Sequence, residues 1–447
     1  MSATLHRERF PTLTANGQRM LDFLAGHPHA PFYRNASGNR LQAHEVELVH
    51  AFEREVAGAA VGWAPGALPA WLPAFVAETF ATVPYYRALG SPPLHFADIA
   101  PVSRADLAAD IARFVPDHVG TERLINFQTT GTTGHPLVVA SHPLVAARYA
   151  AFHKRALARH GIVPRHGAGQ VGVVLLGYQQ RCFTYVSVNP AMGESGLAKI
   201  NLHPNDWRDP ADRARYLDAL DPEIVAGDPI SFGAYLDLPL TTRPRALISV
   251  SMMLHAGLRA RLEARFGCPV LDIYSLNEVG PVGVFDAALG GHLLLQPRLF
   301  VEILDAQGMP AAPEQSGEIT VSGGFNFCLP LLRYRTGDFA SLAHTPEGPV
   351  LLGLSGRRPV RFFARGAWIN NVDITHALRP LPISHFSFHQ EADGAVILAL
   401  APGAMAQAGP ARAALAPLFG EQPVHITIIT ADDKTLQYTS NLAGAHT

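Results

Sequence analysis

Short apolar runs alternate with helix-like segments through the middle of the chain, and this alternation most constrains its fold. The runs at residues 171–177, 223–226 and 246–250 have the length of single buried strands. Residues 210–220 and 256–266 have helical spacing, and Gly267 ends the second of these segments. Alternation of strand and helix predicts a layered α/β domain with a parallel sheet.

The pattern differs on either side of this region. Before it, residues 1–65 are mostly helical in pattern, and further helices are expected at 71–81 and at 104–114, after the capping candidate Ser103. After it, three apolar runs indicate a more antiparallel, barrel-like part, at residues 301–304, 317–321 and 340–342.

The organisation restarts beyond Gly356. A strand at 395–399, a helix at 410–419 and a strand at 424–430 predict a small α+β domain. We therefore expect a helical extension over residues 1–67, a large domain over 68–355 and a small C-terminal domain over 356–447.

Composition excludes several classes of protein. With 48% hydrophobic residues and 16% charged residues, the chain can bury a large core. Its net charge of -2 provides no excess of positive charge that would indicate nucleic-acid binding. Prolines at 65, 69 and 73 interrupt the longest apolar stretch, so no membrane span is expected. The N-terminus lacks the apolar run of a signal peptide, and the three widely spaced cysteines do not suggest disulfides. We expect a cytoplasmic protein.

One turn-rich segment lies between two apolar runs. Its glycines allow backbone amides to turn inward and its hydroxyls add donors, so it can wrap phosphate oxygens, although the Walker sequence is absent. A Thr/Gly hairpin turn is the alternative interpretation. The segment reads Thr129, Thr130, Gly131, Thr132, Thr133, Gly134, His135, Pro136.

Two later segments carry acids beside aromatic residues. Asp272, Tyr274, Asn277 and Glu278 follow an apolar run, where an aromatic ring can stack on a base and an acid can hold a divalent cation. In the stretch from Tyr334 to Asp338, an acid after a tight turn can accept both hydroxyls of a ribose.

The order, identity and separation of these segments resemble the adenylate-forming superfamily and, within it, the phenylacetate–CoA ligase branch. The motifs that carry the resemblance are TTGTTGHP, without the lysine that other branches have after the proline, DIYSLNEVGPVG, and LPLLRYRTGDF. It runs from about residue 68 to the C-terminus. The resemblance implies a large α/β domain with parallel sheets and a small barrel-like part, followed by a small mobile α+β domain.

The resemblance also implies a site for ATP and Mg²⁺. Residues 129–134 would cradle the β- and γ-phosphates. Tyr274 would lie against the adenine, and Asp338, assisted by Arg357, would hold the ribose hydroxyls. Glu278 would bind Mg²⁺, with Asn277 at a position that is usually Ser or Thr.

Three further residues are assigned by the same resemblance. Lys434, the only lysine after position 199, would reach the α-phosphate and the carboxylate, although Asp433 stands where the family has glycine. A solvated loop lysine is the alternative interpretation of Lys434. Asp272 belongs to the nucleotide-binding set, and Ser251 and Met252 replace an Ala-Glu pair that the branch places near adenine.

The implied activity is ATP-dependent conversion of a carboxylic acid to acyl-AMP, followed by acyl transfer to a thiol, with CoA as the expected acceptor. The acid is expected to be of aryl or arylacetic type, from the pocket candidates Tyr178, Phe183, Tyr185 and Phe232. Transfer of the acyl group to an amine or to a carrier protein is an alternative, and a catalytically silent nucleotide-binding protein is a second alternative. No nucleic-acid or membrane partner is expected, and a homodimer stays open.

The chain departs from the family at the domain boundary. Members use a residue two or three positions past the Gly-Arg pair as a hinge, commonly Asp or Lys, and Pro359 stands there after Gly356 and Arg357. Proline fixes φ and restricts the residue before it. Rotation of the small domain between two half-reactions is therefore restricted or displaced to a neighbour.

Overall fold

The structure is a computed structural model, which describes residues 3–129, 137–179, 182–356, 360–378, 380–383, 385–420, 422–429, 437–443 and 445. The chain forms two compact units. Unit 1 comprises Met1–Ala43, His160–Asp272 and Pro359–Thr447, and unit 2 comprises His44–Arg159 and Ile273–Arg358. The chain passes from unit 1 to unit 2 within strand β8 (Val270–Leu276).

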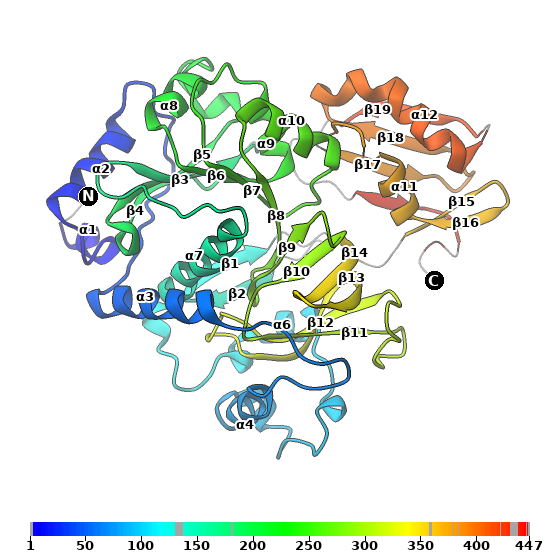
Figure 1. The fold of residues 1–447 in the computed structure, drawn as a ribbon, viewed down its shortest axis with the longest axis horizontal. Coiled ribbons are helices and arrows are strands. Elements are labelled where there is room, and N and C mark those ends of the chain that lie inside the picture. Colours follow the sequence, from blue (N-terminus) through cyan, green and yellow to red (C-terminus); the bar gives the residue numbers. More distant parts are fainter. Residues whose placement is uncertain are drawn as a thin grey trace. The chain divides into compact units, whose positions relative to one another are not determined.

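Unit 1 contains the expected parallel sheet (Figure 1). Its strands are ordered β7-β6-β3-β5-β4, all parallel to their neighbours except β4, which is antiparallel to β5. Apolar side chains on both faces suit a sheet that helices cover. The strands are β3 (Val171–Gly177), β4 (Tyr185–Asn189), β5 (Ser195–Asn201), β6 (Ile224–Gly227) and β7 (Ala246–Val250).

Helices accompany this sheet. The expected helix after the third strand is α10, and Gly267 ends it in the left-handed region at φ 68°, which favours glycine. Helix α2 packs against β4 and β5. The helices are α1 (Ala3–Arg9), α2 (Ala15–Gly26), α8 (Asp212–Leu220), α9 (Pro229–Leu236) and α10 (Ala256–Phe266).

The sheet of unit 2 is antiparallel, as expected for this part of the chain. Its order is β11-β12-β13-β14-β10-β9-β8. Only residues 340–342 of the longest strand, β13, were expected from the sequence, because its polar segment from Arg335 to Asp338 hides the strand pattern. The strands are β9 (Gly280–Asp286), β10 (Gly291–Leu294), β11 (Leu299–Leu304), β12 (Gly317–Gly323), β13 (Leu331–Thr345) and β14 (Gly348–Gly356).

A hairpin and several helices complete unit 2. The Ser103 side chain caps α6 in a capping box with Asp106, as expected, but the helix ends at Ala109 and a 3-10 turn follows. Helix α7 is an addition that the sequence pattern did not single out. The elements are β1 (Ile125–Thr129), β2 (Leu137–Ser141), α3 (Ala43–Gly58), α4 (Leu72–Thr82), α5 (Pro84–Arg87), α6 (Arg104–Ala109) and α7 (Pro143–Ala158).

The C-terminal part of unit 1 is a smaller α/β assembly with its own core. Its four-stranded sheet has the order β19-β18-β17-β20, beside the hairpin β15-β16. Phe362, Phe386, Phe388 and Phe419 are buried in this core, which uses residues between 360 and 438. The elements are β15 (Arg361–Ala364), β16 (Ala367–Asn370), α11 (Asn371–Leu378), β17 (Phe386–Gln390), β18 (Val396–Leu400), α12 (Ala408–Phe419), β19 (Val424–Ile428) and β20 (Tyr438–Ser440).

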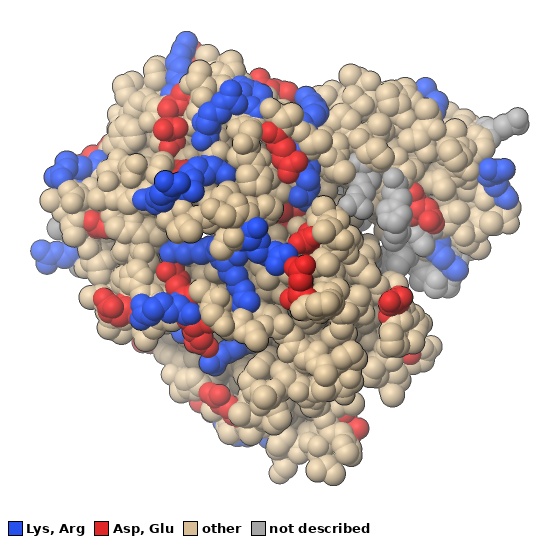
Figure 2. All heavy atoms as spheres, in the orientation of Figure 1, with Lys and Arg blue, Asp and Glu red and all other residues tan. Residues whose placement is uncertain are grey.

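Two general properties bear on partners. Within the part of the chain that the structure describes, no helix combines the length and apolarity needed to cross a bilayer. Figure 2 shows Lys and Arg side chains interspersed with Asp and Glu on the face that it presents.

Candidate active site

The turn between β8 and β9 fixes the position of Glu278. The turn consists of residues 277–279, and the strands on either side pair at Leu276 and Gly280. Gly280 has φ +90°, which favours glycine, and a Cβ at this position would lie in tight contact, 3.1 Å from Cε1 of Tyr149. The Glu278 side chain is buried, whereas Asn277 is exposed.

Two tyrosines approach the Glu278 carboxylate. The Tyr334 hydroxyl donates a hydrogen bond of 2.9 Å to Oε1 of Glu278. The Tyr149 hydroxyl is buried and has no hydrogen-bond partner among the described residues. Burial, and then the charge of Glu278, raise the pKa of both phenols well above the usual value. Both phenols therefore stay protonated at neutral pH and remain able to donate.

Asp338 is positioned by the backbone of β13. Gly337 has φ +79° and its N–H donates to Oε1 of Glu318, while the N–H of Asp338 donates to Oγ1 of Thr336. The Tyr274 hydroxyl donates a hydrogen bond of 2.8 Å to Oδ2 of Asp338. The carboxylate is thereby held in one orientation.

These residues form a single group, which we call the tyrosine–acid cluster: Tyr149, Tyr274, Glu278, Tyr334 and Asp338. Burial raises the pKa of Tyr274 far above its usual range, with smaller contributions from Asp338 and Glu278. Both acids likewise contribute to the raised pKa of Tyr334. The cluster therefore offers two carboxylates that can accept hydroxyl groups or hold a cation, beside phenols that can donate.

The chemistry of Glu278 fits a magnesium ion bound together with a nucleotide. Among the residues that the structure describes, no three His, Cys, Asp or Glu side chains gather into a metal site. Mg²⁺ commonly uses only one or two carboxylates and completes its shell with phosphate oxygens and water. A single buried carboxylate such as Glu278 suits that mode of binding.

Two predicted nucleotide-site residues that the structure describes belong to unit 1. Asp272 is 7% exposed and lies 3.6 Å from Nη2 of Arg259, so it takes part in an ion pair. Ser251 directly follows β7 and has φ 72°. Non-glycine residues are uncommon in this left-handed region and are found at functional sites more often than elsewhere.

The other predicted residues are described only in part or not at all. Thr129 ends β1, where its backbone is the register partner of Leu137. The remaining predicted positions lie outside the described residues, namely Thr130, Gly131, Thr132, Thr133, Gly134, Arg357, Lys434 and the hinge residue Pro359.

Sequence reasoning did not single out Tyr149 or the side chains of Tyr334 and Thr336. Tyr334 and Thr336 stand inside the LPLLRYRTGDF motif, so their proximity to Asp338 was a usable signal. Tyr149 lies on the unexpected helix α7 and carried no such signal. Of the candidate acid-pocket aromatics, Phe232 is a fully buried core residue, which is the commoner role of aromatics near buried strands.

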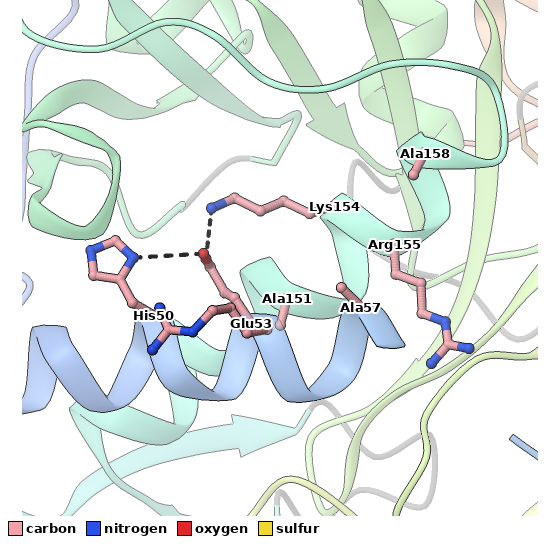
Figure 3. Close-up of a pocket in the computed structure, with 8 residues that line it drawn as sticks. His50, Glu53, Ala57, Ala151, Lys154, Arg155 and Ala158 are labelled. Carbon is pink, nitrogen blue, oxygen red and sulfur yellow. Dashed lines mark hydrogen bonds and ion pairs between the residues drawn. The ribbon is translucent and has the colours of Figure 1, made fainter. Parts of the chain in front are cut away.

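A small cavity of about 340 Å³ lies between α3 and α7 (Figure 3). Lys154 and His50 both point toward the Glu53 carboxylate, at 2.7 and 3.8 Å. Arg155 donates to the backbone oxygens of Val56 and Ala59. These contacts engage His50, Glu53, Lys154 and Arg155 with one another or with the backbone.

Comparison with known sequences gives a short match. No family model matches the chain. A segment of 89 residues is 33% identical to phenylacetate-coenzyme A ligase of Aromatoleum evansii, and one of 89 residues is 34% identical to that of Escherichia coli (strain K12). Each match covers 19% of this chain and 20% of the relative, so about a fifth of these curated relatives is spanned.

Comparison with solved structures extends over most of the chain. A 2-hydroxyisobutyryl-CoA ligase in the postadenylation state, in complex with 2-HIB-AMP, has a TM-score of 0.59 at 16% identity, covering 88% of this chain and 90% of that one. An open conformation of that ligase, with 2-HIB-AMP and CoA, has a TM-score of 0.52 at 16% identity, covering 86% and 91%. At this identity the likeness establishes the fold. The chain therefore has the same fold as these CoA-ligase structures, and about a fifth of it is similar in sequence to phenylacetate–coenzyme A ligases.

Proposed function

We propose that the protein activates a carboxylic acid with ATP to form acyl-AMP and pyrophosphate, and then transfers the acyl group to the thiol of CoA. The observation that carries this proposal is the tyrosine–acid cluster. It groups Tyr274 and Glu278, predicted from one sequence motif, with Asp338, predicted from another; Glu278 is buried, and Tyr274 and Asp338 are half-buried.

Each residue of the cluster suits one part of ATP. Asp338 would accept the two ribose hydroxyls, and its hydrogen bond from Tyr274 would hold the phenol ring against the adenine. Glu278 would hold Mg²⁺ beside the phosphates, with its carboxylate oriented by Tyr334. When bound, the ion offsets phosphate charge. Residues 129–134, Arg357 and Lys434 are proposed from the sequence to complete the phosphate contacts.

The chemistry explains the need for such a site. In the first step a carboxylate oxygen attacks the α-phosphorus, and the bond to pyrophosphate breaks. The negative charge that gathers at this phosphorus must be met by groups already in position. In the second step the CoA sulfur, having lost its proton, attacks the acyl carbon, and AMP leaves. The acyl-AMP intermediate must be protected from water between the steps.

The nature of the acid is a finer part of the proposal. An aryl or arylacetic acid is supported by the partial match to ligases named for phenylacetate and by the aromatic residues Tyr178, Phe183 and Tyr185. The solved relative with the higher TM-score is named for a small branched hydroxy acid, so a carboxylate panel should include one.

The test is ATP–pyrophosphate exchange with phenylacetate, benzoate, 2-hydroxyisobutyrate and hexanoate, each with and without Mg²⁺. We expect Mg²⁺-dependent exchange with at least one acid. ATP binding without exchange for any acid would replace the proposal with a silent nucleotide-binding role. Mass spectrometry of the products with CoA or amines then identifies the acceptor. Pro359 favours an amine acceptor as the second candidate, because an acceptor that needs no domain rotation avoids the restricted hinge.

A further inference from the structure

A second cavity of unit 2, of about 610 Å³, contains none of the residues of the tyrosine–acid cluster. This volume lies within the range of about 300–1,000 Å³ that is typical of small-molecule sites. Residues of α3, α4, α7 and the segment 323–330 line it. Aromatic side chains supply much of its wall, namely Phe52, Trp71, Phe75, Phe325 and Phe327.

Arg148 brings a positive charge to this wall. Its guanidinium carbon lies 4.6 Å from the ring centroid of Phe52 and 5.4 Å from that of Phe327. Its Nε is buried and has no hydrogen-bond partner among the described residues. Burial lowers the pKa of this guanidinium, yet arginine remains charged in proteins. The aromatic rings stabilise the charge of Arg148, but its Nε–H donor stays without an acceptor among the described residues.

Thr79 supplies a second unused donor from a different helix. Its side chain is 1% exposed, and its Oγ1 has no partner within the described part of the chain. Thr82, one turn later on α4, also lines the cavity, but its Oγ1 donates 2.9 Å to the backbone oxygen of Glu78. A buried polar group without a partner costs about 1–3 kcal/mol, so two in one cavity indicate a missing acceptor.

The remaining charges do not supply that acceptor. Glu55 forms an ion pair with Arg298 at 2.8 Å, and both side chains are largely exposed. Glu78 is exposed to solvent. Glu55 is therefore paired with Arg298, although its charge also raises the pKa of Arg148, and the half-buried guanidinium of Arg148 has no hydrogen-bonded carboxylate among the described residues.

We propose that this cavity binds an organic carboxylate with a flat apolar body, the carboxylate on Arg148 and Thr79 and the body against the aromatic wall. Planar carboxylates match the guanidinium donors, and aromatic walls suit a flat body. The site is separate from the proposed adenylation site. It adjoins that site through Phe325, whose N–H donates 2.9 Å to the backbone oxygen of Val279, the neighbour of Glu278.

The test uses 4-bromobenzoate without ATP or Mg²⁺, so that it does not depend on adenylation. Crystals soaked with the acid should show a bromine anomalous peak in the cavity. Calorimetry in solution should give saturable binding that R148Q weakens about tenfold or more and T79V about three- to tenfold, as expected for lost hydrogen bonds to a buried carboxylate. The neutral analogue 4-bromobenzamide should bind about tenfold more weakly.

Matched variants control for general effects. T82V removes a hydroxyl of the same helix that is already bonded, and the double variant E55Q/R298Q removes both rim charges together. Each should change the affinity less than about twofold. If R148Q fails to fold, T79V and the amide still decide the question.

Three outcomes would overturn the proposal: no saturable binding, bromine only outside the cavity, or equal weakening by T79V and T82V. A peak without binding in solution, which means binding at crystal concentration only, also overturns it. Because E278Q should abolish exchange yet leave this binding unchanged, failure of this proposal and failure of the adenylation proposal are distinguishable.

Discussion

The Tyr274 hydroxyl donates a hydrogen bond of 2.8 Å to Oδ2 of Asp338 and so joins two residues that are 64 positions apart in the sequence. Tyr274 lies on β8 and Asp338 on β13. The bond fixes an aromatic ring and a carboxylate relative to each other. Those two groups are the ones proposed to contact adenine and ribose, so the bond would set their spacing before ATP binds.

Removal of the Tyr274–Asp338 hydrogen bond should weaken nucleotide binding more than it slows the chemical step. In Y274F the ring remains but Asp338 loses a charge-assisted bond, worth about 1.5–3 kcal/mol at most. We expect the KM for ATP in pyrophosphate exchange to rise about tenfold, with kcat changed less than about threefold. D338N should raise KM further. A fall in kcat at constant KM would show that the bond does not serve nucleotide binding.

Substitution of Glu278 should stop adenylation without unfolding the protein. E278Q keeps the size of the side chain but loses the charge proposed to hold Mg²⁺, so exchange should fall about 10²-fold or more. Y334F, which removes only the donor to Glu278, should cost about tenfold. Exchange close to normal in E278Q, with unchanged circular dichroism, would remove Glu278 from the mechanism.

Lys434 should matter in only one half-reaction. Its proposed contact is with the α-phosphate and the carboxylate during adenylation, so K434A should slow formation of acyl-AMP but spare the reaction of supplied acyl-AMP with CoA. The two half-reactions can be followed separately by rapid quench. Equal loss in both would instead indicate that Lys434 has a structural role.

Pro359 provides a test of the acceptor. If the small domain must rotate about the segment after Gly356, P359D restores a soft dihedral and should leave thioester formation unchanged or faster. The measurement mixes acyl-AMP with CoA or an amine. Rapid thioester formation by the unmodified protein would refute the restricted hinge. Reaction with amines alone would refute CoA as the acceptor.

Acid should destabilise the fold partly through His153 on α7. Burial lowers its pKa from 6.5 to about 4. The unfolded chain therefore binds the proton more readily, and stability is lost as the pH falls from about 6.5 toward 4. The loss from this residue is about 2 kcal/mol at pH 5. H153Q should lack this component, which urea unfolding at pH 7.5 and pH 5 would reveal. Identical pH dependence in the two proteins would contradict the assignment.

The sequence by itself determined the local elements and the family resemblance. Strands at 171–177 and 246–250 and the helix at 256–266 coincide with β3, β7 and α10, because continuous apolar runs and a glycine stop are local signals. The expected limits of α6 and β13 were less accurate. Asp110, with φ -162°, interrupts the first, and a polar segment lies within the second. The local pattern of apolar and polar residues does not show where a helix or strand is interrupted in this way.

Tertiary structure alone decided which side chains meet. The motifs predicted Tyr274, Glu278 and Asp338 as separate contributors. The fold of unit 2 brings them together with Tyr334 and with Tyr149 of α7, although β8 and β13 are not paired strands. The unused donors of Arg148 and Thr79 became visible only when their surroundings were known. Hydrogen-bond satisfaction depends on neighbours from distant parts of the chain, and no local pattern of residues records it.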